Sequence, residues 1–249
     1  MRTWPIALPS SRRVRQRVRD VLLSGQDSQA TFREDLARRY LRGDGIEIGP
    51  LHHPLRLPPG TRVRYVDVMS REQLLATHTS AVYGDPRWVV GPDVIDDCER
   101  LGTFADASLD FVIANHVVEH TEDPIGALEN LVRVLRPRGV LFLALPDARY
   151  TFDALRERTT VEHLLRDHNQ GPQLSRRDHY HEWAVVECLP NEKIPDRIDE
   201  FARDGARHHF HVWDLDGFLE LLRALDLPAS LELAQGHLDE FVVILRRHE

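Results

Sequence analysis

Residues 109–147 read LDFVIANHVVEHTEDPIGALENLVRVLRPRGVLFLALPD and decide the fold class. The stretches 109–115 and 139–147 are largely apolar, which is typical of strands buried on both faces of a parallel sheet. Between them, 124–139 opens with a proline, repeats apolar residues three and four apart, and stops at Pro137-Arg138-Gly139. Strand, helix and strand in succession predict a βαβ unit of a doubly wound α/β sheet.

Three further strands are predicted upstream of this unit, at 45–49, at 62–68 and, more weakly, at 89–96. The stretch 71–78 has the pattern of a helix. Only residues 50–61 separate the first two strands, and prolines crowd them. We therefore expect the first crossover helix to be short or replaced by a loop.

Downstream, residues 148–211 break the alternation, because they are polar and show no clear strand pattern. Half of the 14 histidines lie there. We expect a mostly helical insertion over the carboxyl ends of the strands. An amphipathic helix at 214–227 and two strands, 230–236 and 239–247, complete the predicted chain.

The composition is that of one globular α/β domain with elaborations, at 249 residues and 42% hydrophobic. A net charge of −8 argues against broad nucleic-acid binding, because phosphates need a basic face. No apolar run reaches the ~18–20 residues that span a bilayer, so no stable membrane insertion is expected. The N-terminus lacks the apolar core of a secretion signal, and two cysteines fit a reducing cytosol, so we expect a cytoplasmic location.

The N-terminal stretch 12–19, RRVRQRVR, departs from this balance. Its arginines either touch a membrane surface or a polyanion, or form the solvated face of an ordinary N-terminal helix. We favour the ordinary helix, and assign residues 1–43 to an N-terminal helical segment.

Polar residues close the predicted strands, and in a doubly wound sheet the ligand lies beyond these carboxyl ends. Acids after three successive strands suit a ligand rich in hydroxyls and amines, whereas a phosphate would need backbone amides, lysines and several glycines. In chain order the candidates are Glu47, Gly49, Pro50, Asp67, Asp97, Cys98, Asn115, His116 and Asp147.

These residue types fit the parts of one ligand. Asp67, eighteen residues past Gly49, is placed to bind both ribose hydroxyls of a nucleoside. Asp97 can accept from an adenine amino group while the backbone of Cys98 meets the ring. Glu47 and Gly49 can hold a charged amino-acid tail. An adenosine joined to an amino acid without phosphate is S-adenosylmethionine.

At this point the chain resembles a known family. The stretches GIEIGP, YVD, DDCERL, DFVIANHVVEH and LVRVLRPRGVLFLALPD, with the closing strand pair, are similar to class I S-adenosylmethionine-dependent methyltransferases. EIGPLHHP, ANHVVEH and PDARYTFDALRERT resemble type 11-like methyltransferases found beside glycosyltransferases in polysaccharide biosynthesis. The resemblance covers 44–249. It implies a Rossmann-like, mostly parallel sheet of seven strands with an antiparallel last strand, a cofactor-binding role for Pro50, and a place beside the sulfonium for Asn115 and His116.

One departure from the family pattern is Leu51, which stands where a second glycine is usual. Two other functions stay open. The same fold can serve as a non-catalytic cofactor-binding or interaction module, although that would not need Glu47, Asp67 and Asp97. A nicotinamide dehydrogenase would need the G-x-G-x-x-G run, which is missing.

The predicted reaction is O-methylation of a sugar or polysaccharide-type small acceptor, and the oligomeric state stays open. A hydroxyl acceptor needs a base, and the candidates are His116 and Asp147. The Glu119-His120 pair is expected to satisfy polar groups at the start of the next helix. Arg149, Tyr150 and Arg156, directly after the fifth strand, are expected to grip the acceptor.

No metal is predicted. His52 and His53 are adjacent on a loop, where two rings rarely point at one ion, so we interpret them as cofactor-loop residues. The histidines of the insertion show no HxxxH or HExxH spacing, although they could include a base or a metal cluster. They are His163, His168, His179, His181, His208, His209 and His211.

Overall fold

Seven strands form one sheet in the computed structural model, which describes residues 28–77 and 85–249. The arginine-rich stretch lies outside the described residues. The sheet order is β3-β2-β1-β4-β5-β7-β6. The strands are β1 (Asp44–Ile48), β2 (Arg62–Asp67), β3 (Val94–Ile95), β4 (Leu109–Asn115), β5 (Leu135–Pro146), β6 (Ala229–His237) and β7 (Glu240–Arg247).

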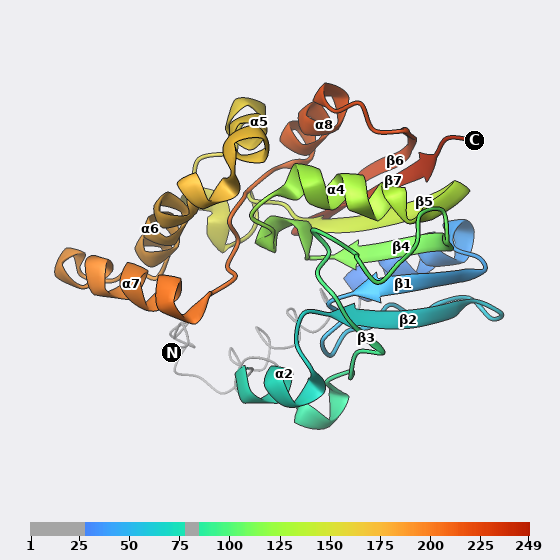
Figure 1. Ribbon diagram of the computed structural model, residues 1–249, viewed down its shortest axis with the longest axis horizontal. Helices are drawn as coiled ribbons and strands as arrows, with labels where there is room; N and C mark the ends of the chain where they lie inside the picture. The colour runs from blue at the N-terminus through green and yellow to red at the C-terminus, as the bar shows by residue number, and fades with distance from the viewer. Residues whose placement is uncertain (1–27, 78–84) are drawn as a thin grey trace, which may run out of the picture.

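The strand directions are those of a doubly wound sheet with one reversed strand. Neighbours from β3 to β5 pair in parallel, whereas β7 runs antiparallel to both β5 and β6 (Figure 1). This confirms the predicted Rossmann-like fold. Ile48 of β1 pairs with Val66 of β2 and with Ala114 of β4, so the carboxyl ends of these strands lie at one edge.

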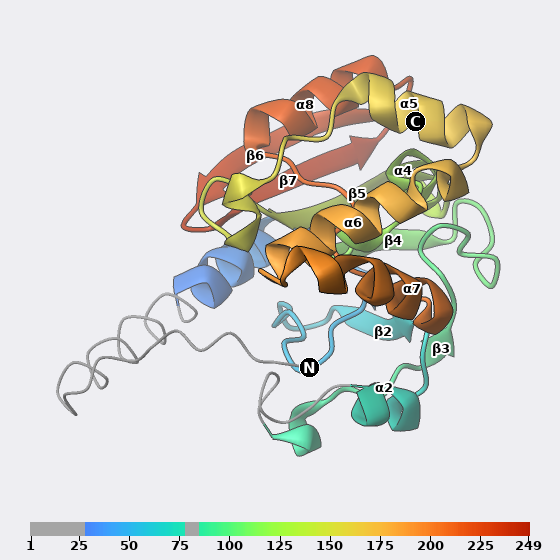
Figure 2. The same cartoon turned by 90° about the vertical axis from the view of Figure 1, so that its left-hand side faces the viewer.

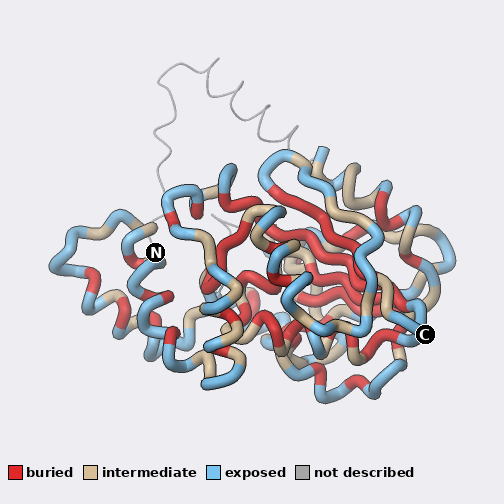
Figure 3. Tube along the Cα trace, turned by 90° about the horizontal axis from the view of Figure 1, so that it is seen from above, coloured by how far each residue is buried: buried red, intermediate tan, exposed pale blue. Residues whose placement is uncertain are grey.

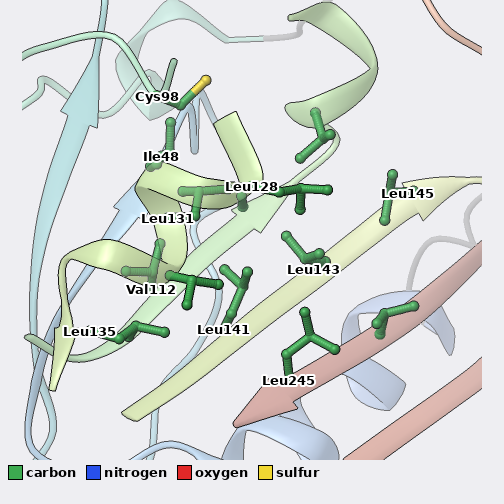
Figure 4. Close-up of a cluster of buried hydrophobic side chains, with 14 of the residues drawn as sticks. Ile48, Cys98, Val112, Leu128, Leu131, Leu135, Leu141, Leu143, Leu145 and Leu245 are labelled. Carbon is green, nitrogen blue, oxygen red and sulfur yellow. The ribbon is translucent and has the colours of Figure 1, made fainter. Parts of the chain in front are cut away.

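Helices α4 (Pro124–Arg133) and α8 (Leu215–Ala224) cover one face of the sheet. Their apolar residues pack with those of the strands in the larger core cluster, part of which is shown in Figure 4. α5 (Val161–Gln170) lies beside them. Figure 3 shows that the strands in the middle of the molecule are buried along most of their length.

The other face is covered by the helix at 28–40 and by the loop after β1. Leu36, Ala37 and Leu41 pack with Leu55 against Phe111 and its neighbours in the sheet. Residues 49–61 contain no helix, as their length and prolines predict. The N-terminal helix therefore fills the place that a first crossover helix would take, and it shares the core of the predicted 44–249 domain.

The boundary between α4 and β5 lies earlier than predicted, since α4 ends at Arg133 rather than 139. Pro137 has no N–H to donate to the carbonyl of Arg133 and would clash with it in a helix. That carbonyl instead accepts from Ala107 and from the guanidinium of Arg247. β3 is also shorter than predicted, with two residues.

The insertion is mostly helical, as predicted. α6 (Arg176–Val186) and α7 (Ile194–Asp204) pack on each other around Tyr180, Ala184, Ile198 and Phe201, and Figure 2 shows the pair in front of the sheet edge. No helix among the described residues is long and apolar enough to cross a membrane. The remaining helices are α2 (Arg71–Thr77) and the short 3-10 turns Pro86–Trp88, Val118–His120, Phe152–Leu155, Pro172–Leu174 and Asn191–Lys193.

Candidate functional site

A cavity of about 740 Å³ lies at the carboxyl ends of β1, β2 and β4, and residues of the insertion form part of its wall. Its size is within the usual range for small-molecule sites. The structure brings seven of the nine predicted site residues into the wall: Glu47, Gly49, Pro50, Asp67, Cys98, Asn115 and His116. Asp97 and Asp147 are not part of the wall.

Glu47 is a buried carboxylate at the end of β1, with 1% of its surface exposed. Both oxygens lie within hydrogen-bond distance of the backbone N–H of Leu55, at 2.9 and 3.1 Å, which fixes the loop after β1. Burial raises the pKa of Glu47 to about 7, although the Leu55 bond and Arg33 oppose the shift. Glu47 is therefore only about half ionised at neutral pH, and a cationic ligand group beside it would favour the ionised form.

The turn after β1 needs left-handed backbone at two positions. Gly49 has φ +60° and Leu51 has φ +46°. Leu51 stands where the family pattern has its second glycine, and its positive φ gives the physical reason for that glycine. His52 and His53 follow in the wall, with ring centroids 3.9 Å apart, and neither belongs to a candidate metal cluster among the described residues.

Asp67 ends β2 and is 8% exposed. One carboxylate oxygen accepts from the N–H of Met69 at 3.1 Å, which turns the chain out of the strand. The backbone carbonyl of Asp67 accepts from Asp96, and this bond holds the next segment against the strand. Asp67 therefore sits in the cavity wall with a fixed orientation, at the position predicted for a ribose-binding acid.

Asp97 lies behind the wall, whereas the buried Cys98 lines it. Arg207 of the insertion donates to Asp97 at 2.6 Å, and the N–H of Glu99 donates at 3.0 Å. Burial by itself raises the pKa of Asp97, but these two donors outweigh it and the pKa stands below its ordinary value. Arg207 itself lines the cavity, so the insertion reaches the predicted adenine side through this ion pair.

Asn115 ends β4 with an amide that binds nothing within the described part of the chain. Its Nδ2 and Oδ1 atoms are both buried without a hydrogen-bond partner there. Leaving such a group unpaired costs about 1–3 kcal/mol, so the amide is placed for a ligand that both donates and accepts.

His116, the next residue, is held by the last strand of the sheet. Its Nε2 lies 2.9 Å from a carboxylate oxygen of Glu240, and the other oxygen of Glu240 lies 3.1 Å from Nε of Arg33. His116 has φ +54°. Burial by itself lowers the pKa of His116, but Glu240 and the nearby Glu119 outweigh it, so the pKa is raised. Neither Glu240 nor Arg33 was among the residues predicted from the sequence. The one signal was a carboxylate at the head of an otherwise apolar strand, EFVVIL.

The predicted role of Glu119 and His120 at the start of α4 is wrong. The N-cap is Asp123, whose side chain accepts from Gly126. Glu119 is fully buried, and neither of its oxygens has a hydrogen-bond partner within the described residues. Burial raises the pKa of Glu119. Its Oε1 lies 3.6 Å from Nδ1 of His116, so it belongs to the site and not to the helix cap.

Four predicted residues that directly follow β5 do not line the cavity: Asp147, Arg149, Tyr150 and Arg156. Asp147 is 2% exposed, and both of its oxygens accept from Arg149. Arg156 is buried and donates to Asp153, to Glu182 and to two backbone carbonyls of the insertion. The bonds of Arg156 join parts of the insertion to one another. Arg149, Tyr150 and Arg156 do not line the cavity, contrary to the expectation that they grip the acceptor there.

Aromatic rings of the insertion form the outer wall instead. Trp183 stacks on His208 with centroids 4.6 Å apart and an interplanar angle of 8°. Phe152, 53% exposed, meets Trp183 edge-on and packs on His209. The cavity therefore joins two unlike surfaces, acids and an amide on the sheet side and aromatic rings on the insertion side.

Comparison with known proteins identifies a domain in this chain. Residues 55–143 match the family model of a methyltransferase domain. The chain carries a methyltransferase domain. It is an S-adenosylmethionine-dependent methyltransferase, with S-adenosylmethionine as the cofactor that the domain implies. No curated protein matches the chain.

Solved structures share the fold of this methyltransferase at low identity. The YcgJ protein from Bacillus subtilis is 11% identical with a TM-score of 0.50, covering 90% of this chain and 99% of that one. A candidate methyltransferase from Bacillus halodurans is 13% identical with a TM-score of 0.50, covering 89% and 100%. The CurJ carbon methyltransferase is 15% identical with a TM-score of 0.44, covering 84% of this chain and about half, 49%, of its own.

The residues of the cavity fit this cofactor. The unpartnered amide of Asn115 offers a donor and an acceptor, and Glu47 offers a buried carboxylate to an amino group. Asp67 lines the cavity at the end of β2, where the sequence predicted a ribose-binding acid. These assignments to the parts of the cofactor stay predictions.

Proposed function

We propose that this methyltransferase O-methylates a sugar or polysaccharide-type small acceptor, with His116 as the general base. The observation that carries the proposal is the bond between His116 and Glu240 at the cavity wall. Methyl transfer to a hydroxyl requires a base for the hydroxyl proton, and an imidazole fixed by a carboxylate is such a base.

The geometry assigns a role to each nitrogen of His116. Because the carboxylate of Glu240 accepts from Nε2–H, the neutral ring carries its lone pair on Nδ1. Nδ1 can take the acceptor's proton, and the imidazolium then lies between Glu240 at 2.9 Å and Glu119 at 3.6 Å. Bound S-adenosylmethionine supplies the methyl group on a sulfonium. Glu47, Asp67 and Asn115 would hold it in place for in-line transfer to the acceptor.

The outer wall supports a sugar-like acceptor. Phe152 and Trp183 offer flat apolar surfaces, and His120 and His209 stand beside them as polar groups. Aromatic faces together with a few polar side chains suit a ring that is apolar on its face and carries hydroxyls at its edge. The resemblance to methyltransferases found beside glycosyltransferases supports the same class. Free cysteines, Cys98 and Cys188, support a cytoplasmic location.

Labelled cofactor incubated with a panel of glycans tests the proposal by the mass and position of the product. We expect an O-methylated sugar. His116→Gln should lower kcat by ~10²–10⁴-fold and leave the affinity for S-adenosylhomocysteine nearly unchanged. His181→Ala, an exposed position on α6, is the matched control.

Two results would count against the proposal. Methylation at nitrogen or carbon would remove the sugar hydroxyl as the acceptor. Cofactor binding with no transfer to any acceptor would favour the non-catalytic module, in which the histidine has no reaction to serve.

A further inference from the structure

Four side chains that could bind a metal meet outside the cavity wall. His163 and Asp167 lie on α5, His179 lies on α6, and His211 lies in the segment before α8. One ring nitrogen from each of the three histidines lies within 4.8 Å of the others. No single segment of the sequence has the spacing of a metal site, so no metal was predicted, whereas this cluster is assembled from three segments.

The distances in the cluster are those of ligands around one ion. Nε2 of His163 lies 3.3 Å from Nε2 of His179 and 3.0 Å from Oδ2 of Asp167. Oδ2 of Asp167 lies 3.9 Å from Nε2 of His179. Around a tetrahedral zinc with bonds of about 2.0–2.1 Å, neighbouring ligand atoms lie about 3.3–3.4 Å apart.

Burial leaves ligand atoms of this cluster without partners. Asp167 and His179 are 1% and 5% exposed, and His211 is fully buried. Oδ2 of Asp167 and Nδ1 of His211 have no hydrogen-bond partner among the described residues. Buried polar atoms are nearly always paired, and an ion is one explanation for a group of them that is not.

The neighbours of the cluster orient these atoms as metal sites require. The other oxygen of Asp167 accepts from the hydroxyl of Ser175 at 2.7 Å, which leaves Oδ2 facing the rings. The carbonyl of Glu122 lies 3.3 Å from Nε2 of His211 and accepts its proton, which leaves the lone pair on Nδ1. A metal-binding histidine is usually fixed in this way by a carbonyl or carboxylate on its second nitrogen.

We propose that His163, Asp167, His179 and His211 bind one zinc ion. Three imidazoles and a carboxylate suit zinc, and four protein ligands make the closed site of a structural ion. The ion would clamp α5 and α6 to the segment at 208–213. His208 and His209 of this segment line the cavity, so the ion would hold the acceptor-side wall in place without touching the reaction.

Zinc binding requires a change in the hydrogen bond between Arg166 and His163. The guanidinium of Arg166 donates to Nδ1 of His163 at 3.0 Å, so the metal-free ring carries its proton on Nε2 and donates it to Nε2 of His179. Zinc at Nε2 requires the proton on Nδ1, and Arg166 then turns to Ser175 and Asp167, its other partners. About half of the Arg166 side chain is exposed, so it is free to turn.

Metal content of the full chain, purified without a metal-chelating tag, tests the site without reference to methyl transfer. After zinc loading and dialysis we expect about one zinc per chain. Removing it with a chelator should lower Tm by about 5–10 °C. Cobalt in its place should give the visible absorption of a tetrahedral site. Less than a tenth of a zinc per chain, or an octahedral cobalt spectrum, would overturn the proposal.

Variants assign the ion to this cluster. His179→Ala and Asp167→Asn should each weaken zinc binding at least ~100-fold, whereas His181→Ala, on the same helix but exposed, should not. Glu119, His120 and His209 form a second possible cluster at the cavity wall. Zinc lost in His120→Ala but kept in His179→Ala would place the ion there and refute the assignment. Binding of S-adenosylhomocysteine checks that each variant is folded.

Discussion

Replacing Glu47 by glutamine should change how both stability and cofactor binding depend on pH. Glu47 is almost fully buried, and its pKa is raised from 4.5 to about 7. Above pH 4.5 the unfolded chain loses this proton while the native chain keeps it, so the native state is destabilised as pH rises toward 7. A shift of this size corresponds to about 3 kcal/mol.

Glutamine keeps an oxygen for the N–H of Leu55 but does not ionise. Between pH 5 and pH 8, the wild type should therefore lose about 2–3 kcal/mol of unfolding free energy relative to Glu47→Gln. Urea unfolding of the cofactor-free chain at both pH values measures the difference. Glu72→Gln, at an exposed position of α2, is the matched control.

The pH dependence of cofactor affinity is a second test of Glu47. If ionised Glu47 binds the amino group of the ligand, the ionised fraction limits affinity. For a pKa of about 7, that fraction rises roughly tenfold from pH 6 to pH 7.5, and so should the affinity for S-adenosylhomocysteine. The variant should bind more weakly and without this slope. Stability curves of wild type and Glu47→Gln that stay parallel across pH, or a flat wild-type affinity, would refute the reasoning.

Three further substitutions test other parts of the site. Asp67→Ala should weaken S-adenosylhomocysteine binding by ~2–4 kcal/mol, measured by calorimetry, because ribose hydroxyls lose a charged acceptor; unchanged affinity would remove Asp67 from the site. Glu240→Gln removes a charge that raises the pKa of His116, so the pKa of His116 should fall. Because the proposed base acts when it is neutral, the acidic limb of the pH–rate profile should move to lower pH. An unmoved limb would exclude this histidine as the base. Leu51→Gly should be more stable than Leu51→Ala by ~1 kcal/mol in thermal unfolding, because φ is +46° there, and the reverse order would show that no strain is stored.

The fold was predictable where the pattern is local. The strand predicted at 109–115 has the same bounds as β4. It could be predicted because a strand buried on both faces has a nearly continuous run of apolar residues. The helix predicted to run to 139 stops at Arg133. Part of the reason is distant, since the carbonyl of Arg133 accepts from Arg247, which the local pattern cannot show.

In the candidate site, too, some residues were predictable from local sequence patterns and others were not. Residues that follow parallel strands, such as Glu47 and Asp67, were predictable because topology brings strand ends to one edge. Glu240 was not, because it reaches the site only through the antiparallel pairing of Pro146 with Glu240. Arg33 was not either, since nothing in the sequence says which face its helix covers.

The contact between Glu240 and His116 has a consequence for the order in which the enzyme is completed during synthesis. The cavity residues assigned to the cofactor all lie between 47 and 115, and their strands can pair as soon as that part of the chain has left the ribosome. The partner of His116, Glu240, lies 124 residues later, at the start of the final strand. A nascent chain would therefore gain the proposed cofactor pocket first and the support of the proposed base last. A shortened chain that ended before β7 would lack the Glu240 partner of His116.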